Sequence, residues 1–287
     1  MGLYQGSKSL IPKFELNMEE ITADEVQSAW DSYPPPCLTF SSPSAFSVSA
    51  ENNGWDGTME YSTDQSLWTP WSGIEVDAKK RGGTYSLYFR GTGNTKVTGS
   101  YSNKWTLTGS NIACTGNIES LLDYATVAAG NHPSMAANCY YSMFQDCTGL
   151  TSAPALPAMT LADSCYRQMF YGCTSLTAAP ALPATKLAGN CYNSMFRVCT
   201  GLTAVPALSA TKLADICYYY MFYGCTSLKL SATQTGSYTQ AYRIPTSGTG
   251  TTASGALSSM FTNTGGTFTG TPEINTTYYL DESNTIV

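Results

Sequence analysis

The hydrophobic pattern divides the chain into segments of different character. From Cys37 to about Gly109, apolar and polar residues alternate in short runs such as AFSVSA, TMEYS and TYSLYFRG. Turn sequences such as NNGWDG and KKRGG separate these runs. Alternation of this kind predicts half-buried strands, and several short strands at this spacing predict a small antiparallel β-sandwich over residues 37–110. Its many Trp and Tyr side chains suit a packed core better than an exposed sugar platform.

Residues 135–238 repeat one 26-residue pattern four times without a shift in phase. A fixed period in this range predicts stacked supersecondary units that bury a shared core. The positions that keep the phase are Cys at 139, 165, 191 and 217, Tyr at 140, 166, 192 and 218, Met-Phe at 143–144, 169–170, 195–196 and 221–222, Cys at 147, 173, 199 and 225, and Leu at 150, 176, 202 and 228.

Each repeat divides into two halves with different predicted structure. Placed on a helix, the invariant residues of CYRQMFYGC (165–173) fall within an arc of about 140°, which predicts a helix with one packed face. The following LTAAPAL suits a short extended segment with Leu176, Ala178, Pro180 and Leu182 on the inner side and Thr177, Ala179 and Ala181 on the outer side. Together the segments predict a mixed α/β fold, in which a helix-plus-strand solenoid of four repeats follows the β-sandwich module.

The variable positions of the predicted helices are the candidate binding residues. They differ from repeat to repeat, whereas the packed positions do not, so we expect them to face water. Tyrosine offers an apolar body, a polar tip and few rotatable bonds, and it therefore suits a contact surface. The simpler alternative is that each of these side chains is only solvated. The candidates are Tyr141, Arg167, Tyr171, Arg197, Tyr219, Tyr220 and Tyr223.

The repeat resembles the leucine-rich repeats of BspA-like proteins, which occur on bacterial surfaces and in phage or prophage proteins. The resemblance lies in MFYGCTSL (169–176) and MFRVCTGL (195–202), where that family usually has Ala-Phe-x-x-Cys-x-x-Leu. Met in place of Ala, and the Ala-Pro-Ala-Leu-Pro segment, depart from the family pattern. The resemblance implies a leucine-rich-repeat solenoid and a role in adhesion or recognition, because the family is associated with those functions.

Three flanking segments complete the predicted organisation. Residues 1–36 are expected to be an attachment segment and a proline-rich linker, with a short helix over residues 23–30 that Thr22 and Glu25 would cap. Residues 111–134 are expected to cap the start of the solenoid, through an amphipathic turn in GNIESLLDY. Residues 239–287 are expected to cap its end, and LSSMFTNTGG (257–266) echoes the repeat.

Composition and charge exclude several classes of partner. The formal net charge is −6 and no basic run occurs, so nucleic-acid binding is not expected. No apolar run approaches the roughly 20 residues that a membrane-spanning helix needs. The ten cysteines lack a Cys-x-x-Cys pair and His132 is the only histidine, so no metal and no cofactor are expected. The eight repeat cysteines are expected to be buried as free thiols.

No catalytic constellation stands out, and we expect the protein not to be an enzyme. The isolated His132 cannot complete a Ser-His-Asp triad by any recognisable spacing. A carbohydrate-active enzyme is kept as the third hypothesis, because Asp56, Glu60, Asp64 and Glu75 share the β module and paired carboxylates hydrolyse glycosides.

The first hypothesis is a recognition protein of a phage virion, a tail or fibre component. Its partners would be a bacterial surface protein or glycan, together with other virion proteins contacted through the N-terminal segment, and it would form a homo-oligomer. The opening MGLYQGSKSLIPKFELNMEE lacks the apolar core of an export signal, which agrees with virion localisation. The alternative is a BspA-like adhesin on the bacterial cell surface or outside the cell.

Overall fold

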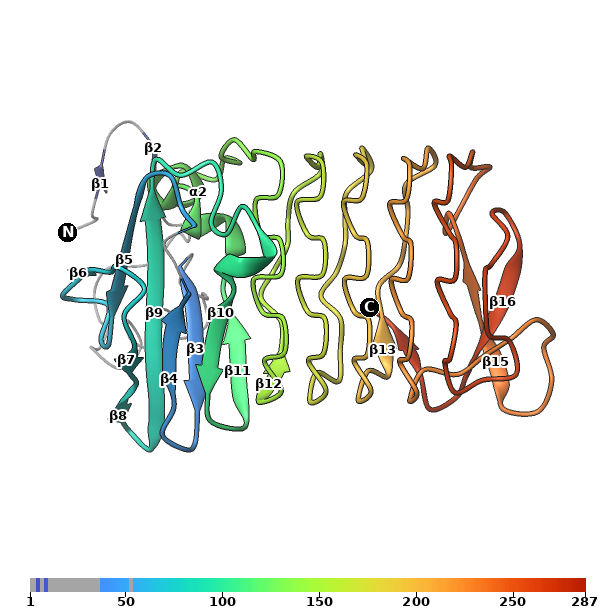
Figure 1. The fold of residues 1–287 in the computed structure, drawn as a ribbon, viewed down its shortest axis with the longest axis horizontal. Helices are drawn as coiled ribbons and strands as arrows, with labels where there is room; N and C mark the ends of the chain where they lie inside the picture. Colours follow the sequence, from blue (N-terminus) through green and yellow to red (C-terminus); the bar gives the residue numbers. More distant parts are fainter. Residues whose placement is uncertain (1–3, 6–7, 10–36, 52–53) are drawn as a thin grey trace, which may run out of the picture.

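The computed structural model describes residues 4–5, 8–9, 37–51 and 54–287. The helix expected over residues 23–30 and the proline-rich linker lie outside the described residues. Strands β1 (Tyr4–Gln5) and β2 (Lys8–Ser9) form an antiparallel pair. From residue 37 onward, a β module, a stack of coils and a C-terminal sheet follow one another along the long axis of the molecule (Figure 1).

The N-terminal module is built from two sheets. The larger sheet has the order β12-β11-β3-β9-β5-β6, with β8 also paired to β9, and the smaller has the order β10-β4-β7. The strands of the larger sheet are β3 (Leu38–Ser42), β5 (Thr58–Ser62), β6 (Thr69–Pro70), β8 (Lys79–Arg81), β9 (Thr84–Thr92), β11 (Ile112–Thr115) and β12 (Leu150–Ser152). Those of the smaller sheet are β4 (Ser47–Ala50), β7 (Val76–Asp77) and β10 (Trp105–Thr108).

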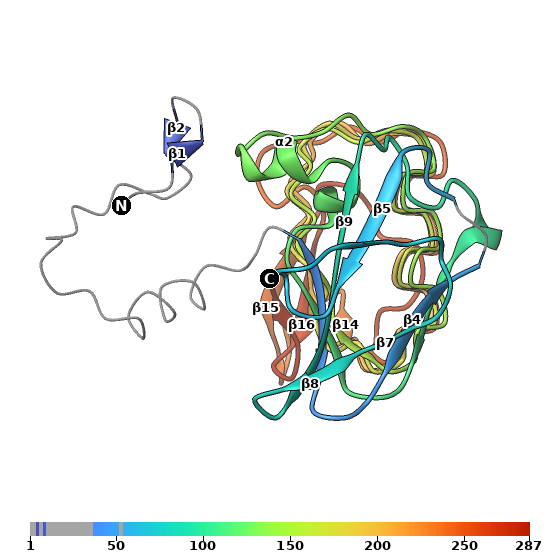
Figure 2. The same cartoon turned by 90° about the vertical axis from the view of Figure 1, so that its left-hand side faces the viewer.

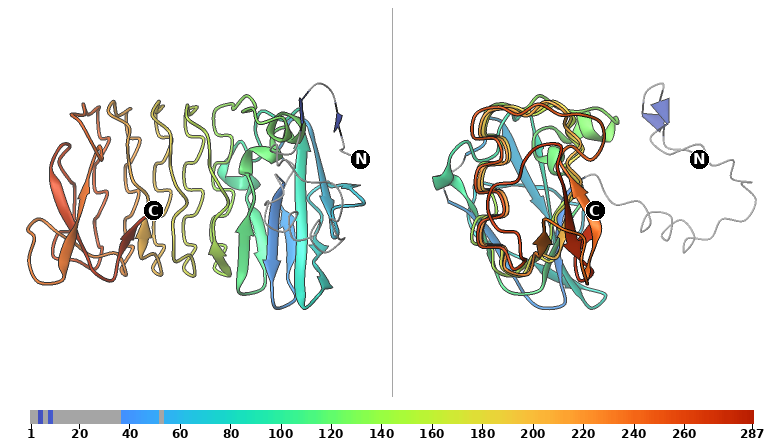
Figure 3. Two further views of the ribbon diagram at one scale, coloured as in Figure 1. Left: turned by 180° about the vertical axis from the view of Figure 1, so that it is seen from behind. Right: turned by 90° about the vertical axis from the view of Figure 1, so that its right-hand side faces the viewer.

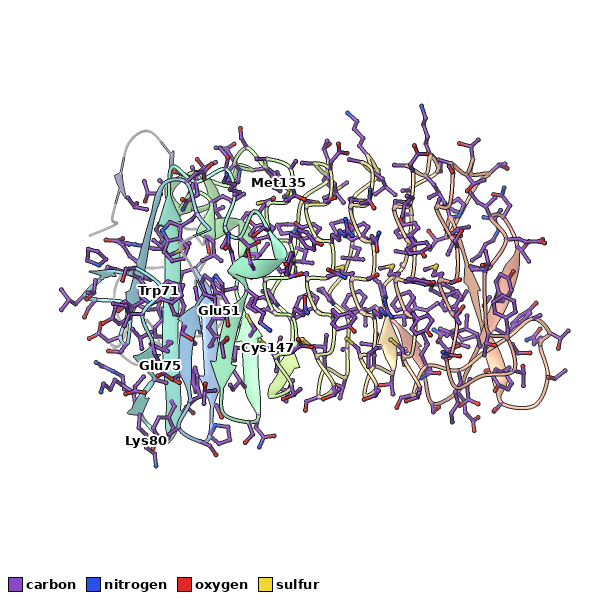
Figure 4. The ribbon with its side chains drawn as sticks, in the orientation of Figure 1. Glu51, Trp71, Glu75, Lys80, Met135 and Cys147 are labelled. Carbon is purple, nitrogen blue, oxygen red and sulfur yellow. The ribbon has the colours of Figure 1, made fainter. Side chains whose placement is uncertain are left out.

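Aromatic side chains fill the core of the module. The ring of Trp105 lies 4.8 Å from that of Trp71 and 5.1 Å from that of Phe89, measured between centroids. Trp105 and Phe89 are fully buried, and Trp71 is nearly so. In Figure 4, Trp71 and Glu75 lie at the end of the molecule that is farthest from the C-terminal sheet. These two buried tryptophans are therefore core residues and do not form a surface platform.

The module continues into the stack without a break in hydrogen bonding. Strand β11 pairs antiparallel with β3 on one side and parallel with β12, which belongs to the first coil, on the other. The backbone N–H of Trp105 donates to the Met143 carbonyl at 2.8 Å, and the Phe40 ring meets the Phe144 ring edge-on at 5.9 Å. Cys147 lies at this junction (Figure 4). The buried side chains of both regions form one continuous core.

Two short helical turns, η2 (Ile118–Leu121) and α2 (Tyr124–Ala128), follow β11 and cover the start of the stack. A further 3-10 helix, η1 (Tyr101–Asn103), lies in the module. The Asp123 carboxylate accepts a hydrogen bond from the Thr126 N–H at 2.9 Å and so caps α2. All four residues of η2 are buried, the polar Glu119 and Ser120 included, so η2 lacks the exposed polar face of the amphipathic turn predicted over residues 116–124.

The prediction of a helix in each repeat is wrong. Residues 135–238 are all described, and they contain no helix. Each supposed helix is a series of tight turns in which every fourth residue has a left-handed backbone, as at Asn138, Ser142 and Asp146. The fold is therefore predominantly β, and the helix-plus-strand leucine-rich-repeat architecture expected from the sequence is not present.

The hydrogen bonds explain why these turns replace a helix. The Tyr141 and Met143 N–H groups donate to carbonyls three residues earlier in the same coil, which closes successive tight turns. The alternate N–H groups of Tyr140, Ser142 and Phe144 donate to carbonyls of the next coil at 2.8–2.9 Å. Each coil thus satisfies half of these donors only through its neighbour, so the stack and the backbone conformation depend on each other.

The repeated side chains form continuous ladders through the stack. The Cys, Tyr, Met, Phe and Leu residues that keep the 26-residue phase are all buried, which confirms the predicted core. Successive rings lie 5.5–5.8 Å apart in the tyrosine ladder that starts at Tyr140, and nearly parallel. The phenylalanine ladder continues past Phe222 to Phe261 at 5.6 Å, so residues around the echo at 257–266 form a fifth coil. Viewed along the stack, the coils superimpose (Figure 2).

The predicted faces of the extended segment need one correction. Leu176 and Leu182 are buried and Thr177 and Ala181 are exposed, as expected, but Ala179 is buried and Ala178 and Pro180 are only half-buried. A single parallel bridge links Ala178 to Ala204, and the Ala179 N–H donates to the Ala204 carbonyl. Pro180 has no N–H to extend this pairing, and the alternation of inner and outer faces fails at residues 178–180 before it resumes at Ala181 and Leu182.

The C-terminal residues close the far end of the stack and return along its side. Strands β14 (Leu230–Ser231), β16 (Thr277–Asp281) and β15 (Tyr238–Arg243) form an antiparallel sheet in that order. Strand β17 (Thr285–Ile286) then pairs parallel with β13 (Ala204–Val205) of the third coil. Figure 3 shows the C-terminus beside the middle of the stack.

Candidate functional site

The candidate residues lie on one outer side of the turns. Because the left-handed residues recur every four positions, Cys139, Met143 and Cys147 all point into the core. Tyr141 and Gln145 lie between them and are half-buried at the surface. The same positions in the later coils hold the other candidates except Tyr220, which occupies the left-handed position equivalent to Ser142. We call the following set the tyrosine–arginine face: Tyr141, Arg167, Tyr171, Arg197, Tyr219, Tyr220 and Tyr223.

Arg197 is the centre of the larger group of contacts on this face. Its guanidinium carbon lies 4.8 Å from the ring centroid of Tyr223, 5.3 Å from that of Tyr220 and 5.6 Å from that of Tyr171. A cation within about 6 Å of an aromatic ring is attracted by the ring quadrupole. Tyr171 comes from the second coil and Tyr223 from the fourth, so stacking of three coils assembles this cluster.

The remaining tyrosines extend the cluster toward the C-terminal end. The rings of Tyr219 and Tyr220 lie 4.0 Å apart, and those of Tyr220 and Tyr223 lie 5.0 Å apart. The Asn263 amide donates to the Tyr223 hydroxyl at 2.9 Å. Asn263 belongs to the fifth coil and was not among the candidates, although aligning MFTN with MFYG would have placed it at the position of Gly224.

Arg167 and Tyr141 form a separate pair. The guanidinium carbon of Arg167 lies 5.1 Å from the Tyr141 ring centroid, and Tyr141 precedes it by one coil. The structure thus divides the seven candidates into a pair and a cluster of five. Every one of the seven is half-buried, so none extends freely into water.

Some variable positions do not face water as the helical interpretation requires. Ser142, Gly172 and Asn193 are buried, although each stands at a position that varies between repeats. Ser142 occupies the left-handed position of its turn, where the backbone folds back against the next coil. The variable set therefore includes residues that shape the turns as well as residues that could contact a partner.

The two arginines of the face lack the acceptors that other arginines have. Arg81 and Arg90 pair with carboxylates, and Arg243 donates to backbone and amide oxygens. Among the described residues, neither Arg167 nor Arg197 has a hydrogen-bond acceptor within reach, and the buried Nε of each has none. Guanidinium groups bind carboxylates and phosphates through paired N–H donors, so this capacity is unused on the face.

A groove of about 340 Å³ lies elsewhere, between the cap and the first coils. Glu119, His132, Met135, Met159 and Leu161 contribute to its walls. The His132 Nδ1 lies 2.7 Å from a carboxylate oxygen of Glu119, and the Glu119 side chain is only 2% exposed. Burial raises the pKa of Glu119, and contact with His132 opposes part of that rise. The single histidine therefore covers a buried carboxylate.

The four carboxylates considered for glycoside hydrolysis each hold local structure. Desolvation raises the pKa of Asp56, but the hydrogen bonds that its carboxylate accepts, chiefly from Thr95 and also from the Lys96 N–H, together lower it. Backbone N–H groups of the following turn lower the pKa of Asp64. Glu60 pairs with Arg90 at 2.8 Å, and Glu75 accepts from the Ser47 hydroxyl. A general acid needs a raised pKa, and neither aspartate has one.

The cysteines are buried free thiols, and five of them also donate hydrogen bonds: Cys37 to the Gln65 side chain, and the other four to backbone carbonyls. All ten are free. The Cys173 thiol donates to the Phe144 carbonyl of the preceding coil at 3.0 Å, and Cys199 and Cys225 repeat this contact one and two coils later. Cys147 donates in the same way to Trp105 of the module. Burial raises the pKa of Cys147 and of Cys225 to about 12, which keeps both protonated.

Among the described residues, no group of three or more His, Cys, Asp or Glu side chains is arranged to hold a metal ion. None of the helices in the described ranges is long and apolar enough to cross a membrane.

Comparisons of the chain with protein-family models, with curated proteins and with solved structures found no match.

Proposed function

We propose that this chain is a non-enzymatic recognition protein that binds a ligand on the bacterial surface through the tyrosine–arginine face. The observation that carries the proposal is the position of Arg197 between the rings of Tyr171, Tyr220 and Tyr223. Tyrosine and arginine are enriched among the residues that dominate binding energy: tyrosine buries a large area with few rotatable bonds, and arginine contributes several hydrogen-bond donors on a planar charged group. Here they gather on one side of a rigid scaffold.

The stack supports this role by fixing the side chains before a ligand arrives. Hydrogen bonds between coils hold the backbone beneath Arg197 and Tyr223, and the Asn263 amide fixes the Tyr223 hydroxyl. Side chains that are already ordered lose little entropy on binding. Solenoids present such extended surfaces because successive units place equivalent positions side by side.

Within this proposal we place the protein on a phage virion, as a tail or fibre component, with a bacterial cell-surface adhesin as the alternative. Both assignments draw on the resemblance to BspA-like repeats and both use the same face. They differ in where the protein is found. Mass spectrometry of purified phage particles distinguishes them, because a virion protein is recovered at a fixed number of copies per particle.

Binding of the fluorescently labelled full chain to a panel of bacterial species tests the proposal. The double variant Tyr219→Ala/Tyr223→Ala should reduce binding to a responsive species at least about tenfold, because two aromatic contacts are lost. Tyr101→Ala is the matched control, since Tyr101 is 67% exposed but lies in the module. Failure to bind any species, or equal loss in the control, would rule out this role for the face.

A further inference from the structure

We infer that the ligand of the tyrosine–arginine face is an anionic glycan, a sugar polymer that carries carboxylate or phosphate groups. This inference rests on the proposed function and adds the chemical class of the ligand. It follows from the unused donors of Arg167 and Arg197, from the rings that surround them, and from the absence of aliphatic anchors among the residues of the face.

The two arginines of the face have no counter-charge from the part of the chain that the structure describes. The chain has a formal net charge of −6, and yet its face holds two arginines without a carboxylate partner among the described residues. Two carboxylates of neighbouring turns, Asp163 and Asp215, accept backbone N–H groups of Gly189 and Ser254 instead. The guanidinium groups therefore remain available to an anion from outside the chain.

The guanidinium of Arg197 is oriented by the rings around it. The tyrosine rings around Arg197 contact its flat guanidinium from the neighbouring coils and hold it in place. The buried Nε cannot reach an external anion, so the donors that would match the two oxygens of a carboxylate or phosphate are those of the two terminal Nη groups. Because Arg167 lies one coil before Arg197, the face offers two such positions along the stack, which suits a polymer with repeated anionic groups.

The side chains of the face favour a sugar over a protein. Protein interfaces also use Tyr and Arg as anchors, but they combine them with an apolar centre that becomes fully buried. The strongly exposed apolar side chains of the described residues lie elsewhere, with Leu67 and Ile74 in the module and Met159 on the groove. The face itself offers rings, amides and guanidinium groups. Such a surface stacks against the C–H faces of sugars and bonds to their hydroxyl and anionic groups.

Affinity electrophoresis of the full chain in gels that contain a defined polymer tests the inference. The polymers are polygalacturonate, which carries carboxylates, a glycerol-phosphate teichoic acid, which carries phosphates, and dextran, which is neutral. We expect retardation by one of the two anionic polymers, and their comparison identifies the anionic group. Dextran should give none. Salt should weaken the retardation, because it screens the charges at a partly exposed site.

The variant Arg197→Gln provides the decisive comparison, because it keeps most of the side-chain size and removes the charge. It should weaken binding to the anionic polymer at least about tenfold, and Arg167→Gln should also weaken it. Arg81→Gln is the control, because that arginine is exposed in an ion pair of the module. Melting temperatures of the variants identify any that fail to fold. If Arg197→Gln fails to fold, Arg167→Gln still tests the inference.

Two outcomes would overturn the inference and leave the proposed function standing. One is equal binding to dextran and to the anionic polymers, unchanged by Arg197→Gln. The other is binding to bacterial cells that protease treatment of the cells removes and periodate treatment does not, which would identify a protein ligand. The proposed function fails separately, if the chain binds no bacterial species at all.

Discussion

The module and the stack bury the same kinds of side chain by different means. In the module, Phe89 meets Phe40, Trp71 and Trp105 at interplanar angles of 58–77°. These partners come from strands far apart in sequence, as the pairing of β3 with β9 shows. The module core is therefore formed by different side chains from different segments, and none of its contacts is repeated along the chain.

In the stack, by contrast, each ring has partners of its own kind. Phe170 lies between Phe144 and Phe196 at interplanar angles of 24° and 2°. Both partners are 26 residues away, so a coil contacts mainly the coils before and after it. Repeat arrays of this kind have stabilities that add up from units and nearest-neighbour interfaces. We therefore expect a core substitution to destabilise the whole module when it lies in the module, but only the adjacent coils when it lies in the stack.

The largest expected effect comes from removing one ring in each region. Phe170→Ala and Phe89→Ala should each cost about 3–5 kcal/mol of unfolding free energy, because both leave a cavity in a packed core. Hydrogen exchange should separate them. Phe170→Ala should increase exchange in its own and the two adjacent coils, whereas Phe89→Ala should increase it across the module. Equal spreading in both variants would contradict the comparison.

Glycine is required for different reasons in the two regions. An added Cβ at Gly91 of β9 would lie 1.8 Å from the Leu121 backbone oxygen, so Gly91→Ala should cost about 3 kcal/mol by overpacking. Gly172 has a φ of 72°, and its added Cβ would meet mainly the movable carboxylate of Asp146. Gly172→Ala should therefore cost only about 1 kcal/mol, from the left-handed backbone. Thermal unfolding measures both, and a larger loss at Gly172 would refute this ranking.

The two cysteine ladders of the stack should respond differently to serine. Cys173→Ser places a hydroxyl beside the Phe144 carbonyl that now accepts the thiol, whereas the Cys165 thiol donates to no acceptor among the described residues. Cys165→Ser would thus bury an unpaired hydroxyl and should be about 2 kcal/mol more destabilising. Urea unfolding of both variants provides the measurement. Equal losses would show that the thiol hydrogen bond is unimportant.

The smallest effect is expected on the outer side of the extended segment. Thr177 is exposed, and its carbonyl, not its side chain, accepts hydrogen bonds from the third coil. Thr177→Ala should change the unfolding free energy by less than about 0.5 kcal/mol. Ala179→Thr is the inward counterpart, because Ala179 is buried, and it should be clearly more destabilising. If Ala179→Thr left the unfolding free energy unchanged, Ala179 would face outward, as the alternation in the sequence predicted.

The sequence could not distinguish the turns from a helix by hydrophobic spacing. Packed residues recur four positions apart, as at Cys165, Met169 and Cys173, and on a helix this spacing leaves them within 80° of one another. The left-handed positions carried the better signal. Gly172 and Asn190 are residue types that tolerate positive φ, but Ser142 and Val198 occupy equivalent left-handed positions without any such preference.

The sequence identified the candidate face although the backbone conformation predicted for it, a helix, was wrong. A helix and a ladder of four-residue turns both place Arg197 and Tyr223 on the outside, because four residues differ little from one helical turn. The clustering was not predictable, since it depends on which coil stands beside which. Asn263 was missed because the insertion before the fifth coil breaks the 26-residue phase. The binding role of the face stays a prediction.

By itself, the sequence determined the period of the stack and the side chains that it hides. Identical residues at a fixed spacing can share one core only if their units lie on one another, so the periodicity was sufficient. The tertiary structure decided the backbone conformation and the surface. Half of the N–H groups in these turns bond to the next coil, and the surroundings of Arg197 come from three coils. Such partners exist only once the chain has stacked.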